Sequence, residues 1–371
     1  IGVSLLLQNL GLKIFQARPK PFPEIMAIKI WDIGGVIISN MQIVMLGTSV
    51  MLMLLLSLAG CGATPTTSAT PTASTEQTSV MPARGGAGGS STFASVAPTY
   101  ADLAYATVSD AQKLDLYIPT TGSGPFPVVI MVHGGGFMMG DKSDGAGLTG
   151  VDQLLAAGYA VASINYRLSS EAIYPAQIYD AKAAVRFLRA NAAEYQLNPD
   201  KFGAWGASAG GSLVSLLGTT CGVAELEGAE LGNAEQSSCV QAVIDWFGPI
   251  DFLKMDEQFA GTSCPQTHDA ANSPESMLVG AAIQTVPDLV ATTNPMNYIT
   301  ADDAPFLIEN GTADCNIPPA QNKNLADALS AVIGVDNVTY VSLDGAGHGG
   351  SQFETTENLA LVISFLDKYL K

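Results

Sequence analysis

The chain has 371 residues, of which 47% are hydrophobic, and its 34 Asp and Glu against 16 Lys and Arg give a formal net charge of −18. Such an acidic surface repels a phosphate backbone, which argues against nucleic-acid binding. Residues 93–371 suffice for one large α/β domain, whereas residues 1–92 have the composition of targeting and spacer segments.

The N-terminal residues divide into three segments of different composition. Residues 1–40 are expected to be an upstream extension of doubtful status. Residues 41–60 are almost wholly apolar and end in small residues before Cys61. This pattern resembles a bacterial lipoprotein signal, in which Cys61 is lipidated, although no basic residue lies within the segment. An uncleaved membrane anchor is the alternative. Residues 61–92 are rich in Thr, Ser, Pro and Gly and predict a flexible spacer. We therefore expect an exported protein of the cell envelope or extracellular space, anchored to the membrane through Cys61.

Strand and helix patterns alternate along the rest of the chain. The first strand, 113–117, alternates in polarity and is expected at the edge of a sheet. Several later runs are continuously apolar, which is typical of strands buried on both faces of a parallel sheet. The predicted strands are 113–117, 126–132, 159–166, 201–206, 242–247, 305–311 and 338–343, and the predicted helices are 176–193, 208–217 and 352–369. This order predicts an α/β fold with a doubly wound, mostly parallel sheet. Residues 252–300 have no clear strand pattern and are expected to be an insertion or partial lid.

A candidate nucleophile lies between a predicted strand and a predicted helix. Ser208 stands in the tract Gly206-Ala207-Ser208-Ala209-Gly210. A serine between glycines at two-residue spacing fits the sharp strand-to-helix turn that exposes a hydroxyl group. A glycine-rich turn without chemistry is the alternative. A serine hydroxyl is a weak nucleophile until a base takes its proton, so a base must be sought elsewhere.

A candidate base and a candidate acid follow the serine in the chain. His348 lies in a glycine-rich loop after the last predicted strand, and Asp314 follows the strand before it. The expected role of Asp314 is to orient and stabilise the imidazole of His348. Asp251 and Asp344 are the rival acids. Of the other two histidines, His268 is expected at the surface.

The tract His133-Gly134-Gly135-Gly136 follows the predicted strand 126–132. Glycines let backbone N–H groups approach a reacting carbonyl closely. We expect Gly135 and Gly136 to donate hydrogen bonds to an oxyanion, together with Ala209, which follows the candidate nucleophile. His133 is expected to fix this loop by hydrogen bonding.

Four cysteines remain beside Cys61: Cys221, Cys239, Cys264 and Cys315. An even set in an exported chain is typical of disulfides, and three pairings are possible. We favour Cys221–Cys239 and Cys264–Cys315, with free thiols as the alternative. The sequence contains no C-x-x-C or H-E-x-x-H motif, so we expect no metal site.

Together these motifs resemble those of α/β-hydrolase esterases with an HGGG oxyanion loop, the hormone-sensitive-lipase-like group. The similarity is greater to the BD-FAE (feruloyl-esterase-like) bacterial carboxylesterases. It runs from about Leu114 to Tyr369. It is carried by Asn165-Tyr166-Arg167-Leu168, Tyr174-Pro175-Ala176 with Asp180, Gly206 to Gly211, Ser273-Pro274-Glu275-Ser276 and the loops of Asp314 and His348. Asn310 departs from the pattern, because a histidine often precedes the glycine of the acid loop.

The resemblance implies Ser208, Asp314 and His348 as a catalytic triad and Gly135, Gly136 and Ala209 as oxyanion donors. It also implies cofactor-free hydrolysis of short-chain or cell-wall esters, feruloyl and acetyl esters among them, so that the expected partner is a small or polysaccharide-linked ester. Two other readings stay open. One is a serine peptidase of the prolyl-oligopeptidase type, and the other is a non-catalytic lipoprotein that uses the fold for binding.

Overall fold

The computed structural model of the chain describes residues 30–33, 36–39, 96–144 and 148–371. The chain divides into two units, residues 1–84 and 85–371. In the first unit, β1 (Ile30–Ile33) pairs antiparallel with β2 (Val36–Ser39). The predicted signal segment 41–60, the candidate lipidation residue Cys61 and the spacer 61–92 lie outside the described residues. Among the described residues, none of the helices has the length and hydropathy that a bilayer-spanning segment needs.

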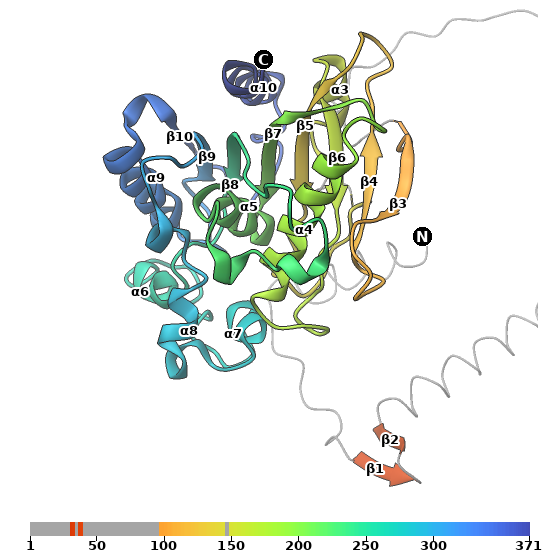
Figure 1. The fold of residues 1–371 in the computed structure, drawn as a ribbon. Coiled ribbons are helices and arrows are strands. Elements are labelled where there is room, and N and C mark those ends of the chain that lie inside the picture. The colour runs from red at the N-terminus through yellow and green to blue at the C-terminus, as the bar shows by residue number, and fades with distance from the viewer. Residues whose placement is uncertain (1–29, 34–35, 40–95, 145–147) are drawn as a thin grey trace, which may run out of the picture. The chain divides into compact units, whose positions relative to one another are not determined.

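An eight-stranded sheet forms the centre of the second unit (Figure 1). Its strand order is β10-β9-β8-β7-β5-β6-β4-β3. The pairs from β10 to β6 are parallel, and β4 and β3 are added antiparallel. The strands are β3 (Tyr100–Ala104), β4 (Lys113–Tyr117), β5 (Phe126–Val132), β6 (Ala160–Ile164), β7 (Leu197–Ala207), β8 (Ala242–Trp246), β9 (Phe306–Gly311) and β10 (Val338–Leu343). The α/β fold with a mostly parallel, doubly wound sheet is confirmed.

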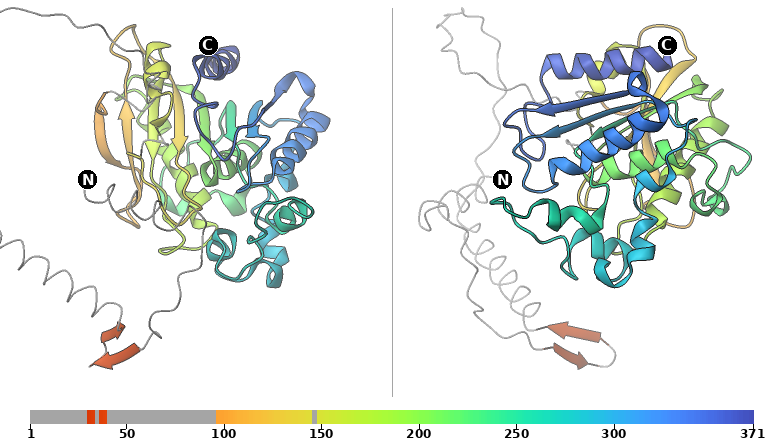
Figure 2. Two further views of the ribbon diagram at one scale, coloured as in Figure 1. Left: turned by 180° about the vertical axis from the view of Figure 1, so that it is seen from behind. Right: turned by 90° about the vertical axis from the view of Figure 1, so that its left-hand side faces the viewer.

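Helices cover both faces of this sheet, and Figure 2 shows α9 and α10 on opposite sides of it. The central strands are apolar on both sides because each face has its own layer to pack against. One core cluster joins the sheet to α4, α5 and α9, and the other joins it to α3 and α10. The helices are α3 (Val151–Ala156), α4 (Ala176–Ala190), α5 (Ala209–Thr219), α9 (Pro319–Ile333) and α10 (Thr356–Leu370). Of these, α3 and α9 are not among the predicted elements.

The prediction that 113–117 forms an edge strand is wrong. β4 lies between β6 and β3, and β3 is the edge. Asp115 on β4 is buried, and the ammonium of Lys142, itself nearly buried, forms ion pairs of 2.9 Å with both Asp115 and Asp102 of β3. Asp115, one of the polar positions that suggested an exposed edge, is therefore neutralised inside the structure.

The region 252–300, expected to be an insertion or partial lid, contains short helices and no strand. Its α-helices are α6 (Met255–Gln258), α7 (Pro274–Val279) and α8 (Pro287–Ala291), which lie together in Figure 1. Buried apolar side chains attach the region to the main core, among them Phe252, Leu278 and Val290. The region is thus packed as part of the domain.

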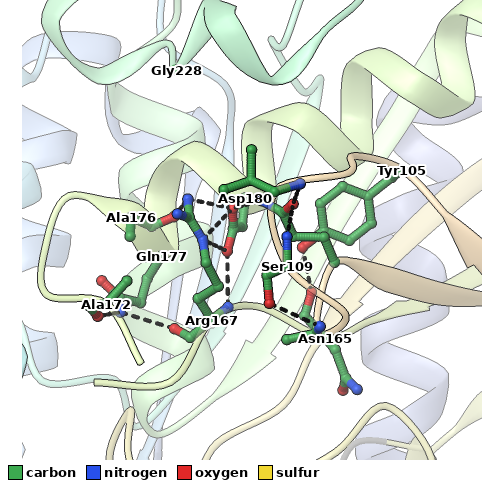
Figure 3. Close-up of polar contacts among 12 residues, drawn as sticks. Tyr105, Ser109, Asn165, Arg167, Ala172, Ala176, Gln177, Asp180 and Gly228 are labelled. Carbon is green, nitrogen blue, oxygen red and sulfur yellow. Dashed lines mark hydrogen bonds and ion pairs between the residues drawn. The ribbon is translucent and has the colours of Figure 1, made fainter. Parts of the chain in front are cut away.

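A polar network connects the loop after β6 to α4 (Figure 3). The guanidinium of Arg167 donates to both oxygens of the buried Asp180, and the backbone N–H of Arg167 donates to the same carboxylate at 2.8 Å. Gln177 donates to the backbone carbonyls of Arg167 and Ala172. A paired and hydrogen-bonded buried charge fixes geometry, so this network holds the loop that follows β6.

Candidate active site

Ser208 occupies a sharp turn between β7 and α5. Its backbone has φ 56° and ψ −124°, a conformation that non-glycine residues rarely adopt. The turn forces the neighbouring backbones together: a Cβ atom at Gly206 would overlap the carbonyl of Gly210, and one at Gly210 would overlap that of Val132. The glycine spacing is therefore a steric requirement of the turn, which projects the Ser208 side chain from the end of the strand.

His348 connects Ser208 to Asp314 through both of its ring nitrogens. Nε2 lies 2.9 Å from Oγ of Ser208, and Nδ1 lies 2.8 Å from Oδ2 of Asp314. The Asp314 side chain is fully buried, and its Oδ1 accepts the backbone N–H groups of Asn316 (2.7 Å) and Ile317 (3.0 Å). The carboxylate is thus locked in place by its own loop. The three predicted site residues meet although they come from three separate loops.

The two rival acids, Asp251 and Asp344, have other partners. Both ring nitrogens of His348 are already engaged, so neither Asp251 nor Asp344 is hydrogen-bonded to it. Asp344 is exposed and accepts a hydrogen bond from the hydroxyl of Thr312. Asp251 precedes the short turn 252–254, and its backbone is held by Gln321.

The glycine tract lies directly beside Ser208. Gly135 and Gly136 have φ of 101° and 60°, which glycine adopts without strain. No hydrogen bond within the described ranges uses the N–H groups of Gly135 or Gly136. The N–H of Ala209 belongs to the first turn of α5, where amides have no partner within the helix. Unpaired donors beside the Ser208 hydroxyl are what an oxyanion site needs.

His133 supports this glycine loop, as predicted. Its Nδ1 lies 2.8 Å from the carbonyl oxygen of Gly134, and its ring stacks on Tyr166 at 4.4 Å between centroids. The Tyr166 hydroxyl donates to the His133 carbonyl at 3.1 Å. Burial lowers the pKa of the His133 imidazole, so the ring is held neutral.

A cleft of about 510 Å³ opens above Ser208 and His348. Its walls are mostly apolar and include aromatic rings and methionines. The ring of Phe247 meets the His348 imidazole edge-on, with centroids 4.7 Å apart. None of these lining residues is among the predicted site residues, because apolar side chains carry no chemical signature, and Pro274 contributes to the sequence analysis only through the family resemblance. These lining residues are Met138, Met139, Trp246, Phe247, Pro274 and Phe353.

A second cavity, of about 60 Å³, also borders Ser208. Gly136 and Ala209 line it, whereas His348 does not. Pro274 lines both spaces, so the region 252–300 contributes to the site. Ser208 therefore borders one large space, lined by the imidazole together with Gly135 and Gly136, and one small space, lined by Gly136 and Ala209.

The expectation that His268 is a surface residue is wrong. It is 7% exposed, its Nδ1 lies 3.0 Å from Oε1 of Glu275, and its Nε2 lies 3.0 Å from the carbonyl oxygen of Asn316. Both side chains of the pair line the small cavity. A lone histidine in a polar stretch gives no sign of a partner seven residues later on a helix. Only its neighbourhood in the fold reveals the pair.

Both favoured disulfides are present. Cys221 is bonded to Cys239, and Cys264 is bonded to Cys315. The second bond joins the region 252–300 to the residue directly after Asp314. Within the described ranges, no three Cys, His, Asp or Glu side chains form a group suited to a metal ion.

The BD-FAE family model matches residues 114–329. Among curated proteins, esterase LipC of Mycobacterium tuberculosis is 31% identical over 243 residues, which cover 64% of this chain and 57% of the relative. The chain thus spans little more than half the length of that relative.

Solved structures with the same fold include a bifunctional GH43-CE of Bacteroides eggerthii, with a TM-score of 0.66 and 36% identity over 72% of this chain and 35% of that one. A truncated carbohydrate esterase from gut microbiota also has a TM-score of 0.66, at 32% identity over 76% of this chain and 98% of that one. The family match extends over more than half of the chain and includes Ser208 and Asp314. The chain belongs to the BD-FAE family.

Proposed function

We propose that this protein hydrolyses carboxylic esters through an acyl-enzyme formed on Ser208. The observation that carries the proposal is the continuous hydrogen-bonded chain from the Ser208 hydroxyl through His348 to the buried carboxylate of Asp314. The esterases among its relatives support the same chemistry. In this arrangement His348 is the base and Asp314 holds its Nδ1–H.

The proposed reaction has two halves. In the first, Oγ of Ser208 attacks the ester carbonyl carbon while Nε2 of His348 takes the hydroxyl proton. The resulting oxyanion accepts hydrogen bonds from the amides of Gly135, Gly136 and Ala209, and His348 returns the proton to the leaving alkoxide, which departs as the alcohol. In the second half, water attacks the acyl-enzyme with His348 again as base. The acid is released and Ser208 regains its proton.

The two cavities favour a small acyl group on a bulky alcohol. The leaving oxygen must reach Nε2 of His348, so the alcohol occupies the cleft of about 510 Å³ that the imidazole lines. The acyl group then enters the cavity of about 60 Å³ beside Gly136 and Ala209. Acetyl and similar short acyl groups suit this space better than a feruloyl group. The carbohydrate esterase among the similar structures favours a sugar hydroxyl as the alcohol.

A substrate panel with one variant tests the proposal. We expect the full chain to hydrolyse p-nitrophenyl acetate and acetylated xylan faster than p-nitrophenyl octanoate or methyl ferulate. Ser208→Ala should lower kcat by about 10⁶-fold while the protein stays folded. Residual turnover within tenfold of the parent would indicate another nucleophile. A parent protein that a fluorophosphonate does not label would point to a binding protein, and a preference for peptides over esters would point to a peptidase.

We further propose that the enzyme is exported and attached to the membrane through a lipid on Cys61. The two disulfides support an oxidising compartment, because such bonds are rare in the cytosol. Mass spectrometry of the purified N-terminal peptide tests the lipid. An unmodified Cys61 thiol in membrane-extracted protein would contradict it.

A further inference from the structure

A second histidine–carboxylate pair lies next to the loop that carries Asp314. His268 contacts Glu275 through Nδ1 and the carbonyl oxygen of Asn316 through Nε2, both at 3.0 Å. A carbonyl oxygen can only accept a hydrogen bond, so Nε2 carries a hydrogen. A carboxylate also accepts, so Nδ1 carries the second hydrogen. The contacts therefore describe an imidazolium that donates in two directions.

The peptide unit that His268 holds belongs to the loop of Asp314. The backbone N–H of Asn316 donates to Oδ1 of Asp314 at 2.7 Å, while the carbonyl of the same residue accepts from His268. Asn316 is thus held at both of its backbone polar groups. A displacement of this residue would release one of the two amides that lock the Asp314 carboxylate.

We propose that His268, kept as an imidazolium by Glu275, is a positioning residue that fixes Asn316 and thereby orients Asp314 toward His348. The inference rests on the proposed function, because it assigns His268 a role in the same hydrolytic site. His268 contacts no reacting atom and acts through the loop that holds the acid.

The segment that carries His268 is itself well anchored. The carboxylate of Asp256 accepts the backbone N–H groups of His268 (3.0 Å) and Asp269 (2.9 Å). The disulfide Cys264–Cys315 attaches the same segment to the residue between Asp314 and Asn316. The ring of Phe259 stacks on the imidazole with centroids 6.1 Å apart. An anchored donor can transmit its own position to the loop it holds.

The charged groups around His268 all favour the imidazolium. Glu275 faces it from α7, Asp256 from α6, and Asp314 lies in the loop that it holds. Burial alone would lower the pKa of His268. The hydrogen bond and charge of Glu275, with smaller contributions from Asp256 and the Asn316 carbonyl, outweigh burial and raise the pKa. Without the Glu275 charge, the ring would lose a proton at lower pH and keep only one N–H donor.

Glu275→Gln provides the sharpest test. The amide oxygen of Gln still accepts from Nδ1, but the charge that keeps the ring protonated is gone. With p-nitrophenyl acetate, we expect kcat of the variant relative to the parent to be about tenfold lower at pH 8 and to rise as the pH falls, since neutral His268 cannot donate to both partners. A ratio that does not vary between pH 6 and 8 would overturn the inference.

His268 variants and a control complete the experiment. His268→Leu should lower kcat by about 10- to 100-fold, and His268→Gln, which retains one N–H donor group, should recover part of that loss. Gln284→Ala is the matched control, because Gln284 is exposed and donates to Asp269 of the same segment without touching the acid loop. It should retain the kcat of the parent.

The controls separate the two proposals. If His268→Leu does not fold, as judged by circular dichroism, the pH test on Glu275→Gln decides. If the parent hydrolyses esters and is labelled at Ser208 while folded His268→Leu keeps kcat within twofold, this inference alone fails. If the parent itself is neither labelled nor active, the proposed function fails.

Discussion

Replacing Asp314 by Asn should abolish most of the activity without disturbing the fold, and the structure explains why. Oδ1 of Asp314 accepts two backbone N–H groups, from Asn316 and Ile317. In Asp314→Asn the amide oxygen must take this position, because an NH₂ group cannot accept either bond. The NH₂ group is then directed at Nδ1 of His348, at the place where Oδ2 of Asp314 lies 2.8 Å away.

The side-chain amide of the Asp314→Asn variant, fixed in this orientation, selects the wrong tautomer of His348. Nδ1 must become an acceptor, so Nε2 carries the ring hydrogen and can no longer take the proton of Ser208. Loss of the correct tautomer with intact geometry costs about 10⁴-fold in kcat, or about 5 kcal/mol of transition-state stabilisation. KM should change little, since neither cavity that borders Ser208 is lined by Asp314.

Steady-state hydrolysis of p-nitrophenyl acetate by the parent and three variants measures this effect. Asp251→Asn and Asp344→Asn are matched controls, since both remove a carboxylate near the site that is not bonded to His348. We expect both controls to stay within about threefold of the parent. An Asp314→Asn variant within tenfold of the parent, or a control that loses as much activity, would refute the assignment of the acid.

Two further predictions concern stability. Burial raises the pKa of Glu309 from 4.5 to about 7, and its Oε1 has no hydrogen-bond partner within the described residues. The folded protein therefore holds this proton to higher pH than the unfolded chain. The stabilisation is present below about pH 4.5 and lost as the pH rises through about 7, by about 3 kcal/mol in total. Glu309→Gln should remove this decline. Denaturant unfolding of the parent and the variant from pH 4 to 8 should therefore give free energies of unfolding whose difference changes with pH. A constant difference would contradict a buried, neutral Glu309. For the disulfides, separations of 18 and 51 residues predict a stabilisation of about 3 kcal/mol from Cys221–Cys239 and about 4 kcal/mol from Cys264–Cys315. Replacing either pair of cysteines by serines should lower the free energy of unfolding. Only the loss of Cys264–Cys315 should also lower kcat, since this bond adjoins Asp314. Equal kcat values for the two double variants would show that the loop of Asp314 does not need the disulfide.

The central strands could be predicted from the sequence, whereas the edge of the sheet could not. β5, for example, is a continuous apolar run, because both of its faces are covered. β3 carries mostly exposed residues and has no periodic pattern. α9 was missed because its buried face includes Gln321 and Asn322, which bond to the backbone of neighbouring loops and interrupt the apolar stripe.

The residues of the candidate site were also predictable only in part. Ser208 and its glycines were predictable because a tight turn imposes a local spacing. The aromatic wall of the cleft and the pair His268–Glu275 were not, since their partners come from distant segments. His268, for example, meets a carbonyl 48 residues further along the chain. Contacts of this kind depend on the path of the loops, which local patterns do not encode.

The unusual backbone at Ser208 has a consequence for how this protein can evolve. A non-glycine residue at φ 56° carries a conformational cost of about 1–3 kcal/mol. A glycine at position 208 would remove this cost, so an inactive Ser208→Gly variant is expected to have a higher free energy of unfolding than the parent. Selection for stability and selection for the nucleophilic hydroxyl therefore favour different residues at this position. Gly206 and Gly210, which perform no chemistry, have no such freedom, since any side chain at either one collides with main-chain atoms.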